Sequence, residues 1–473
     1  MITFGTGGWR AVIGEEFTKD NIRRIAAALA RRMVREGCAE SGICTGYDRR
    51  FLSREACIWF SEVMAGEGVK VHFVNLNCPT PQIMFTVKNM GLQYGAMVTA
   101  SHNPAIYNGI KLFTFGGRDA TEAYTNAIQE DANALDPATI RVLDFNEARE
   151  SGRIVFIDPR DAYLDSILRQ IDTDAIRRRR LRAVLDPMHG TSLNGLLTIL
   201  YTARCDVDVI NDQHDAFFGR HLPAPAPDTL LDLQTAVREH NADVGIATDG
   251  DADRLGIIDE KGNYVSANEI LALLYWYLME YKGWRGAAVR NIATTHLLDR
   301  VAEAYGQQCI EVPVGFKHIS SGMDEYDALI GGESSGGLTV RGHISGKDGL
   351  YAASLLVEML CVTGKSMSQL VQGLYDRFGE AHMAEYDWAL TDERKAQIQH
   401  KLMEEKQLPA FPIPVDHVSY RDGCKVYLKG GWVIVRFSGT EPRVRIFAEA
   451  DTIHHAKTLV GIMAREFALP FDA

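Results

Sequence analysis

The segment TASHNP, which follows the apolar stretch YGAMV, places a serine, Ser101, at the exit of an expected strand. His102 lies beside this serine, and Lys111 lies downstream of it. A serine hydroxyl surrounded by positive charge can attack phosphorus or carry a phosphate. The same segment is typical of an ordinary turn, because Ser, Asn and Pro all favour turns. The segment alone does not separate these two interpretations.

A second segment, DGDADR, carries three alternating carboxylates, those of Asp249, Asp251 and Asp253. In a tight loop, three carboxylates can converge on one hard cation such as Mg²⁺. An EF-hand calcium loop is an alternative, since counting from Asp249 places Glu260 at the twelfth position. However, Arg254 stands where that loop needs glycine, and LGIID predicts a strand instead of a helix. A cluster of surface carboxylates that binds no metal is another alternative. If a metal binds to these aspartates, Arg254 would lie next to it and pair with a phosphate group.

A third segment, GGESSGG, combines flexible glycines with polar side chains. Glycines allow close approach of a ligand to the backbone, while Glu333 and Ser335 offer an acceptor and a donor for sugar hydroxyls. A flexible Gly/Ser turn is the simpler interpretation of this segment.

A fourth segment, RFSGTEP, lies between two apolar strands, GWVIVRF and RVRIFAEA. It supplies a guanidinium group, two hydroxyls and backbone N–H groups, which together can hold a phosphate dianion. The residues concerned are Arg436, Ser438, Gly439 and Thr440. An exposed polar hairpin is the alternative.

Composition limits the class of protein. A chain of 473 residues is too long for one core and predicts three or four domains. The formal charge, 50 − 62 = −12, argues against a nucleic-acid surface. Eight scattered cysteines without a CxxC pair favour reduced thiols. The sequence MITFGTGGWR lacks signal-peptide features, and the most apolar helical stretch, ILALLYWYLMEY, is too short to cross a membrane. These observations predict a cytoplasmic protein without a membrane role.

The elements that must position the four segments follow a repeated order. Strand-like and helix-like stretches alternate through the first three quarters of the chain, which predicts α/β units. The final part contains two alternating strands around RFSGTEP and predicts a smaller α+β unit. Each expected domain carries one of the four segments. The expected domains are residues 1–150, 151–260, 261–375 and 376–473.

These segments resemble the motifs of the α-D-phosphohexomutase family, of the phosphoglucomutase and phosphomannomutase type. TASHNP is similar to its phosphoserine loop, DGDADR to its metal loop, GESSGG to its sugar loop and RFSGTEP to its phosphate-binding loop. FGTGGWR is similar to its opening segment, where Arg10 would point into the active site. The resemblance covers nearly the whole chain. It implies three α/β domains with mixed sheets and a smaller, mobile C-terminal α+β domain around a central cleft.

The resemblance also implies a mechanism. A phosphate on Ser101, beside Mg²⁺ on the three aspartates, would pass to a hexose monophosphate and form a 1,6-bisphosphate, after which Ser101 would regain a phosphate. His102, Lys111 and Arg254 would supply orientation and charge at the serine. The residues implied to hold the other phosphate are Arg436, Ser438, Gly439, Thr440 and Arg445.

One departure from the family concerns the proton. Some phosphomannomutases and phosphoglucosamine mutases end the sugar loop in a histidine, where this chain has Gly337. The segment GHISGKDG resembles the phosphoglucomutase branch, which makes Lys347 the candidate for the proton and His343 the reserve. VPVGFKHI resembles the family's loop that senses the orientation of the bound sugar. This resemblance makes Gly315 and Lys317 candidate sugar-binding residues.

The resulting expectation is a Mg²⁺-dependent mutase that interconverts hexose 1-phosphate and hexose 6-phosphate, prefers glucose, and uses glucose 1,6-bisphosphate as activator. Mannose or glucosamine specificity is the nearer alternative. A phosphatase and a non-catalytic sugar-phosphate sensor are more distant alternatives. We expect a monomer or a homodimer that binds neither nucleic acid nor membrane.

Overall fold

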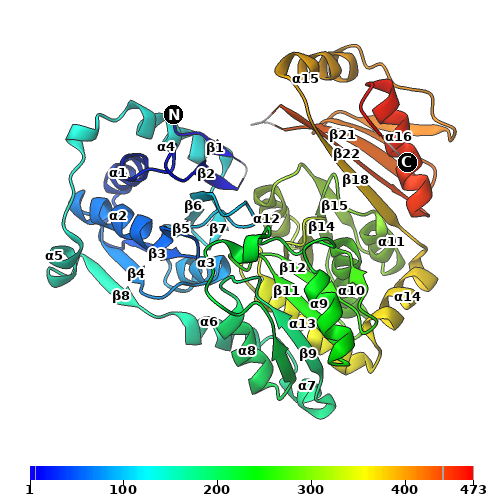
Figure 1. The fold of residues 1–473 in the computed structure, drawn as a ribbon, viewed down its shortest axis with the longest axis horizontal. Coiled ribbons are helices and arrows are strands. Elements are labelled where there is room, and N and C mark those ends of the chain that lie inside the picture. The colour runs from blue at the N-terminus through cyan, green and yellow to red at the C-terminus, as the bar shows by residue number, and fades with distance from the viewer. Residues whose placement is uncertain (6, 439–441, 472–473) are drawn as a thin grey trace.

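The computed structural model describes residues 1–5, 7–438 and 442–471. Four β-sheets divide this part of the chain into four units, which we name the first to the fourth in chain order. Figure 1 shows the first unit on one side, the second and third together, and the fourth standing beside the third.

The first unit contains a mixed sheet in the order β1-β2-β6-β5-β3-β4-β8, with β7 paired to β6. β8 lies beyond the expected boundary at residue 150, yet it pairs in parallel with β4. We therefore place that boundary after β8, and the other expected boundaries stay predictions. The strands are β1 Phe4–Gly5, β2 Gly8–Val12, β3 Ile43–Tyr47, β4 Val71–Val74, β5 Tyr94–Val98, β6 Tyr107–Thr114, β7 Arg118–Asp119 and β8 Ile154–Ile157; the helices are α1 Lys19–Arg35, α2 Ser53–Gly66, α3 Thr80–Asn89, α4 Glu122–Ala134 and α5 Phe145–Glu150.

The second and third units also contain mixed sheets, in the orders β10-β9-β11-β12-β13 and β15-β14-β16-β17. The second unit comprises α6 Arg160–Leu168, α7 Thr173–Arg179, β9 Arg182–Asp186, α8 Leu193–Thr202, β10 Asp206–Val209, α9 Leu231–Glu239, β11 Val244–Thr248, β12 Leu255–Ile258 and β13 Tyr264–Val265. The third comprises α10 Ala267–Glu280, β14 Ala288–Asn291, α11 Leu297–Ala304, β15 Cys309–Val312, α12 Phe316–Glu325, β16 Ile330–Gly332, β17 Leu338–Val340, α13 Gly349–Thr363 and α14 Met367–Phe378.

The same four-stranded arrangement occurs in all three units: β4-β3-β5-β6, β10-β9-β11-β12 and β15-β14-β16-β17. In each, the first three strands run parallel and the last runs antiparallel. The loop between the last two strands carries TASHNP in the first unit, DGDADR in the second and ESSGG in the third. Loops at the carboxyl ends of parallel strands are the usual place for ligand contacts in such sheets.

The second and third units share one hydrophobic core. A single cluster of buried side chains extends from Tyr163 to Phe378 and includes α10 and α13. The first and fourth units each have a core of their own. Because interiors are close-packed, a shared core predicts that the second and third units move together as one body.

The fourth unit is an antiparallel sheet in the order β18-β22-β21-β20-β19, and α16 packs on it (Figure 1). Its elements are β18 His382–Ala389, α15 Asp392–Gln399, β19 Val415–Ser419, β20 Cys424–Leu428, β21 Gly431–Phe437, β22 Arg443–Ala450 and α16 Ile453–Glu466. Among the described residues, no single helix is long and apolar enough for a membrane span; judged only by length and composition, the bent pair α13 and α14 could form one.

The second strand of each four-stranded arrangement, which is β3, β9 or β14, ends in the same turn. A side-chain oxygen at the strand end accepts a hydrogen bond from the backbone N–H two residues later, at 2.8–2.9 Å. The three side chains are those of Asp48, Asp186 and Asn291. In the third unit a neutral amide accepts this hydrogen bond, whereas carboxylates accept it in the other two units.

This equivalence predicts that Asp186→Asn stabilises the protein at alkaline pH. Asp186 is 1% exposed, and burial raises its pKa to about 6. The folded state therefore holds a proton that the unfolded state has lost, and stability decreases as pH rises from about 4 to about 6, by at most about 3 kcal/mol. We expect a higher Tm than the parent at pH 8 and a smaller difference at pH 5. The exposed Asp161→Asn is the control; a lower Tm for Asp186→Asn at pH 8 would contradict the prediction.

Candidate active site

Ser101 is fully buried and lies in the loop between β5 and β6. Its φ is +53°, a left-handed conformation that is unfavourable for a residue other than glycine. Its Oγ donates a hydrogen bond to Asp249 Oδ2 at 2.9 Å, and its backbone N–H donates to Thr99 Oγ1 at 2.8 Å. The strained turn thus holds the hydroxyl against the aspartates of the second unit.

Arg50, in the loop after β3, shapes the Ser101 loop, and sequence patterns did not single it out. Its side chain donates hydrogen bonds to the carbonyl oxygens of Ser101 and Asn103, both at 2.6 Å. It also donates to the carbonyl oxygens of Pro104 and Tyr107, both at 3.0 Å. The only signal in the sequence was an arginine directly after a strand, as in YDRR, which is too common to be diagnostic.

Asp249, Asp251 and Asp253 lie together in the loop between β11 and β12. One ligand oxygen from each lies within 4.8 Å of the others, and all three residues are at most 1% exposed. Among the described residues, Asp251 Oδ1 and Asp253 Oδ1 have no hydrogen-bond partner, although both are buried. Buried carboxylate oxygens without partners are costly unless a cation binds them. The cluster therefore fits a hard divalent cation such as Mg²⁺.

Electrostatics at the cluster support the same conclusion. Burial, followed by repulsion from Asp253 and Asp251, raises the pKa of Asp249 to about 8. Burial by itself would lower the pKa of Lys111, but Asp251 and Asp253, whose carboxylates lie 2.6 and 2.7 Å from its Nζ, raise it. Thr80 Oγ1 also donates to Asp251 Oδ2 at 2.5 Å. Lys111 therefore stays charged and neutralises only part of the cluster.

Three further cations line the same place. Arg10, on β2, donates to Asn103 Oδ1 at 3.0 Å. Arg254 Nε lies 3.9 Å from carboxylate oxygens of Asp249 and Asp253. Lys347 Nζ lies 3.0 Å from Asp253 Oδ2. The site can therefore attract and hold an anion such as a phosphoryl group.

His102 is kept neutral by these cations. The charge of Arg254, then burial, then the charges of Arg10 and Lys347 hold the pKa of His102 well below its usual range. Its Nδ1 lies 3.5 Å from Ser101 Oγ. A neutral imidazole at this place can exchange hydrogen bonds with the serine without adding charge.

The segment ESSGG meets the metal loop at the junction of the second and third units. Glu333 is 9% exposed and accepts hydrogen bonds from Asn291 Nδ2 and Ser335 Oγ, both at 3.2 Å. The carbonyl oxygen of Gly336 accepts from the backbone N–H of Leu255 at 3.1 Å. The Glu333 and Ser335 pair predicted for sugar hydroxyls is thus brought next to the metal loop.

Gly337 makes room for Lys347. A Cβ atom at position 337 would lie 2.2 Å from Lys347 Cδ, so any side chain there would collide with the lysine stem. His343, the reserve candidate for the proton, is 5% exposed and forms a 2.6 Å contact with Asp348. Asp348 in turn caps the N-terminus of α13. The structure therefore places Lys347 at the metal loop and His343 within a supporting network.

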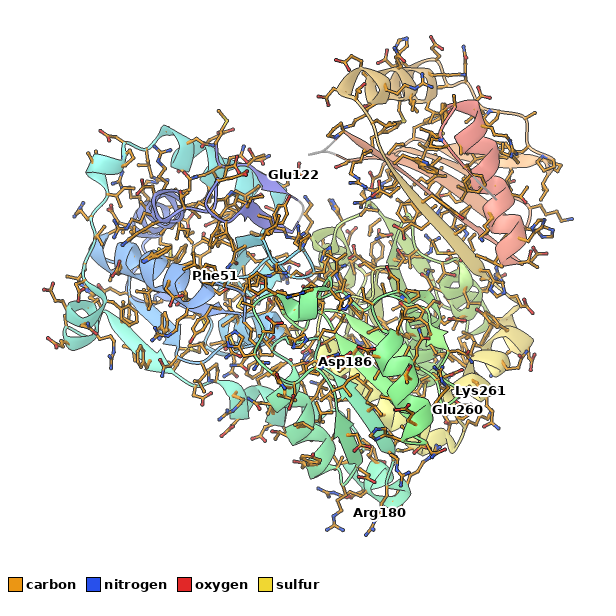
Figure 2. All side chains as sticks on the ribbon, in the orientation of Figure 1. Phe51, Glu122, Arg180, Asp186, Glu260 and Lys261 are labelled. Carbon is orange, nitrogen blue, oxygen red and sulfur yellow. The ribbon has the colours of Figure 1, made fainter. Side chains whose placement is uncertain are left out.

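Other nominated residues have different partners. Lys317 Nζ lies 2.6 Å from Glu122 of the first unit, which is labelled in Figure 2. Gly315 is the N-cap of α12, with φ +122°. Glu260 accepts a hydrogen bond at 2.8 Å from the Oγ of Ser366, the N-cap of α14, and lies beside Lys261 (Figure 2). Because Leu255–Ile258 form the strand β12 instead of a helix, the EF-hand alternative is wrong.

In the fourth unit, Arg436 and Arg445 lie opposite each other on β21 and β22. Arg436 Nη2 contacts both carboxylate oxygens of Asp422, at 3.1 and 3.2 Å. Arg445 Nε lies 3.3 Å from Asp387 Oδ2. Ser438 begins the loop after β21, whereas the predicted phosphate ligands Gly439 and Thr440 lie outside the described residues.

Asp119, on β7, is a carboxylate near the site that sequence patterns also missed. Burial raises its pKa, while the positive charges of Lys347 and Lys111 pull it down. Nothing in the segment GGRDAT distinguishes this aspartate from a residue of an ordinary turn.

Comparison with known families agrees with this geometry. Models of the phosphoglucomutase/phosphomannomutase domains match the chain in order: the alpha/beta/alpha domain I at residues 1–139, domain II at 161–262, domain III at 266–378 and the C-terminal domain at 390–466. The chain belongs to the phosphoglucomutase/phosphomannomutase family. It is therefore a phosphohexomutase, an isomerase that transfers a phosphoryl group, and the predicted fold class of three mixed α/β domains and a smaller C-terminal domain is confirmed.

Individual relatives cover almost the whole chain. A phosphoglucomutase/phosphomannomutase of Thermococcus kodakarensis is 32% identical over 98% of this chain and 99% of that protein. A phosphoglucosamine/phosphogalactosamine mutase of Sulfurisphaera tokodaii is 27% identical over 97% of both chains. A crystal structure from Thermus thermophilus has a TM-score of 0.84 at 30% identity and covers 99% of both chains. The relatives thus belong to the same family, but their names specify different sugars.

Proposed function

We propose that the enzyme interconverts hexose 1-phosphate and hexose 6-phosphate through a phosphoserine at Ser101 and a hexose 1,6-bisphosphate intermediate, with glucose preferred. The observation that carries this proposal is the buried Ser101 Oγ, which donates to Asp249 within a group of cations formed by Arg10, Arg254 and Lys347. A nucleophile in that setting can accept and release a phosphoryl group in alternate steps.

Each group would have a defined task. Mg²⁺, bound by the three aspartates, would neutralise charge on the phosphoryl group. Arg10 and Arg254 would hold its oxygens, and neutral His102 would orient the Ser101 oxygen. Lys347, once it has lost its own proton, would take the proton from the attacking sugar hydroxyl and, as an ammonium, return it to the leaving oxygen. Glu333, Ser335, Gly315 and Lys317 would face the sugar; Arg436, Ser438, Gly439, Thr440 and Arg445 would hold the second phosphate.

Gly337→Ala tests the assignment of Lys347. The added Cβ would displace the Lys347 stem, so we expect kcat to decrease by about 10- to 100-fold, because a misplacement of about 1 Å at a reacting group has that effect. Lys347→Met should lower kcat at least as much. Gly373→Ala is the matched control, since its Cβ would make only ordinary contacts with Trp276. Full activity in Gly337→Ala would show that the position of Lys347 is unimportant.

The preferred sugar is tested by direct comparison. Rates with glucose, mannose and glucosamine 1-phosphates, each with Mg²⁺ and glucose 1,6-bisphosphate as activator, should rank glucose first. A higher kcat/KM for mannose or glucosamine 1-phosphate would transfer the proposal to that sugar, as the names of the relatives allow. Release of inorganic phosphate at the rate of substrate loss would indicate a phosphatase, and binding without isomerisation would indicate a sensor.

Location and assembly belong to the same proposal. All eight cysteines are free thiols, which suits a reducing compartment such as the cytoplasm. We keep a monomer or a homodimer as the expected assembly, with a hexose monophosphate as the partner.

A further inference from the structure

Asp422 lies in the turn between β19 and β20 and joins two units through one carboxylate. Its Oδ2 accepts a hydrogen bond from the backbone N–H of Val314, in the third unit, at 2.8 Å. The same oxygen and Oδ1 also accept from Arg436 Nη2, at 3.1 and 3.2 Å. Asp422 thus contacts both Arg436, which is expected to bind phosphate, and the segment VPVGFKHI, which contains Gly315.

The contact with Asp422 leaves the Nε–H of Arg436 available. Arg436 Nε is buried, and among the residues that the structure describes it has no hydrogen-bond partner. Arginine binds phosphate best through two parallel N–H groups in one plane. Nε–H and one N–H of Nη2 form such an edge, and because Asp422 also accepts from Nη2, it limits the rotation of the guanidinium group and of this edge.

The hydrogen bond from Val314 to Asp422 fixes the distance between Arg436 and the start of α12. Val314 directly precedes Gly315, the N-cap of α12, whose φ of +122° only glycine adopts readily. A carboxylate bound to both Val314 and Arg436 therefore holds the guanidinium at a set separation from the start of α12. A hexose phosphate that contacts both Arg436 and the start of α12 would have to match that separation.

The joint between the third and fourth units does not depend on Asp422 alone. Lys425, on β20, is 0% exposed and donates to the carbonyl oxygen of Ile292 at 2.6 Å and to Glu311 Oε2 at 2.8 Å. Tyr427 donates to Glu311 Oε1 at 2.6 Å. Because these contacts would persist without Asp422, a purely structural role can be separated from a positioning role.

We propose that Asp422 is a positioning residue, which orients the Arg436 guanidinium toward the phosphate of the bound sugar and sets its distance from the loop at Val314. This inference rests on the proposed function, because it assigns phosphate binding to Arg436.

The test combines kinetics with a double-mutant cycle. Asp422→Ala should raise KM for hexose 1-phosphate by about tenfold or more, with a smaller change in kcat, because a charge-assisted contact that positions a ligand is lost. Asp422→Asn should be intermediate, since an amide oxygen can still accept from Val314. In an Arg436→Ala background, Asp422→Ala should change KM by less than about twofold. Asp416→Asn, exposed on β19, is the matched control.

Three outcomes decide the matter. An unchanged KM in Asp422→Ala, or an equal increase with and without Arg436, would overturn the inference. A large decrease in Tm for Asp422→Ala together with an unchanged KM in Asp422→Asn would indicate a structural role and would also overturn it. Binding of glucose 6-phosphate to a Ser101→Ala background, measured by calorimetry, separates the two proposals: Asp422-dependent binding without any turnover by the parent enzyme would support the inference and reject the proposed function.

Discussion

Replacing Ser101 by alanine should lower turnover of hexose 1-phosphate by at least about 10⁴-fold, because removal of a nucleophile abolishes the covalent route. In the structure, Ser101 Oγ is the hydroxyl that contacts Asp249, and the loop around it is held by Arg50. Alanine removes the oxygen without adding bulk, so the fold should be retained. A coupled assay with Mg²⁺ and glucose 1,6-bisphosphate measures the loss.

Intact-protein mass spectrometry provides a second measurement. The parent enzyme should gain one phosphate after incubation with glucose 1,6-bisphosphate, and Ser101→Ala should not. Ser151→Ala, an exposed serine at the end of α5, is the control and should behave as the parent. A fully active Ser101→Ala protein would reject the phosphoserine mechanism.

Chelation of divalent cations should lower turnover by at least about 10³-fold, and Mg²⁺ should restore it. The three buried aspartates would otherwise repel both one another and the phosphoryl group. The half-saturating Mg²⁺ concentration should fall as pH rises from about 6 to about 8. The reason is that Asp249, whose pKa burial and its neighbours raise to about 8 in the metal-free site, must lose its proton before it binds the cation.

Two variants sharpen this experiment. Asp251→Asn should raise the half-saturating Mg²⁺ concentration strongly, because it removes a carboxylate that Lys111 and Thr80 hold in place. Glu260→Gln, at the twelfth position of the rejected EF-hand pattern, should leave it unchanged. Turnover that survives chelation, or an equal effect of both substitutions, would contradict a cation site on Asp249, Asp251 and Asp253.

The two kinds of site residue differ in how they could be found. Ser101, the three aspartates, Glu333 and Arg436 lie in short segments in which several reactive groups follow one another, so their chemistry is visible in the sequence. Arg50, Thr80, Asp119 and Asp422 lie in segments of ordinary turn composition. They became recognisable only through contacts with residues far away in the chain, such as Arg50 with Ser101 and Asp422 with Val314.

The sequence by itself determined the order of the four units, the α/β pattern of three of them and the loops that carry the chemistry, because hydrophobic periodicity and clustered polar groups are local properties. Tertiary structure alone decided that β8 joins the first sheet, that the second and third units share a core, and that Lys317 pairs with Glu122. It also showed why Gly337 is a glycine, since the Lys347 stem occupies the space of a side chain there. These features depend on pairings between distant residues, which no local pattern records.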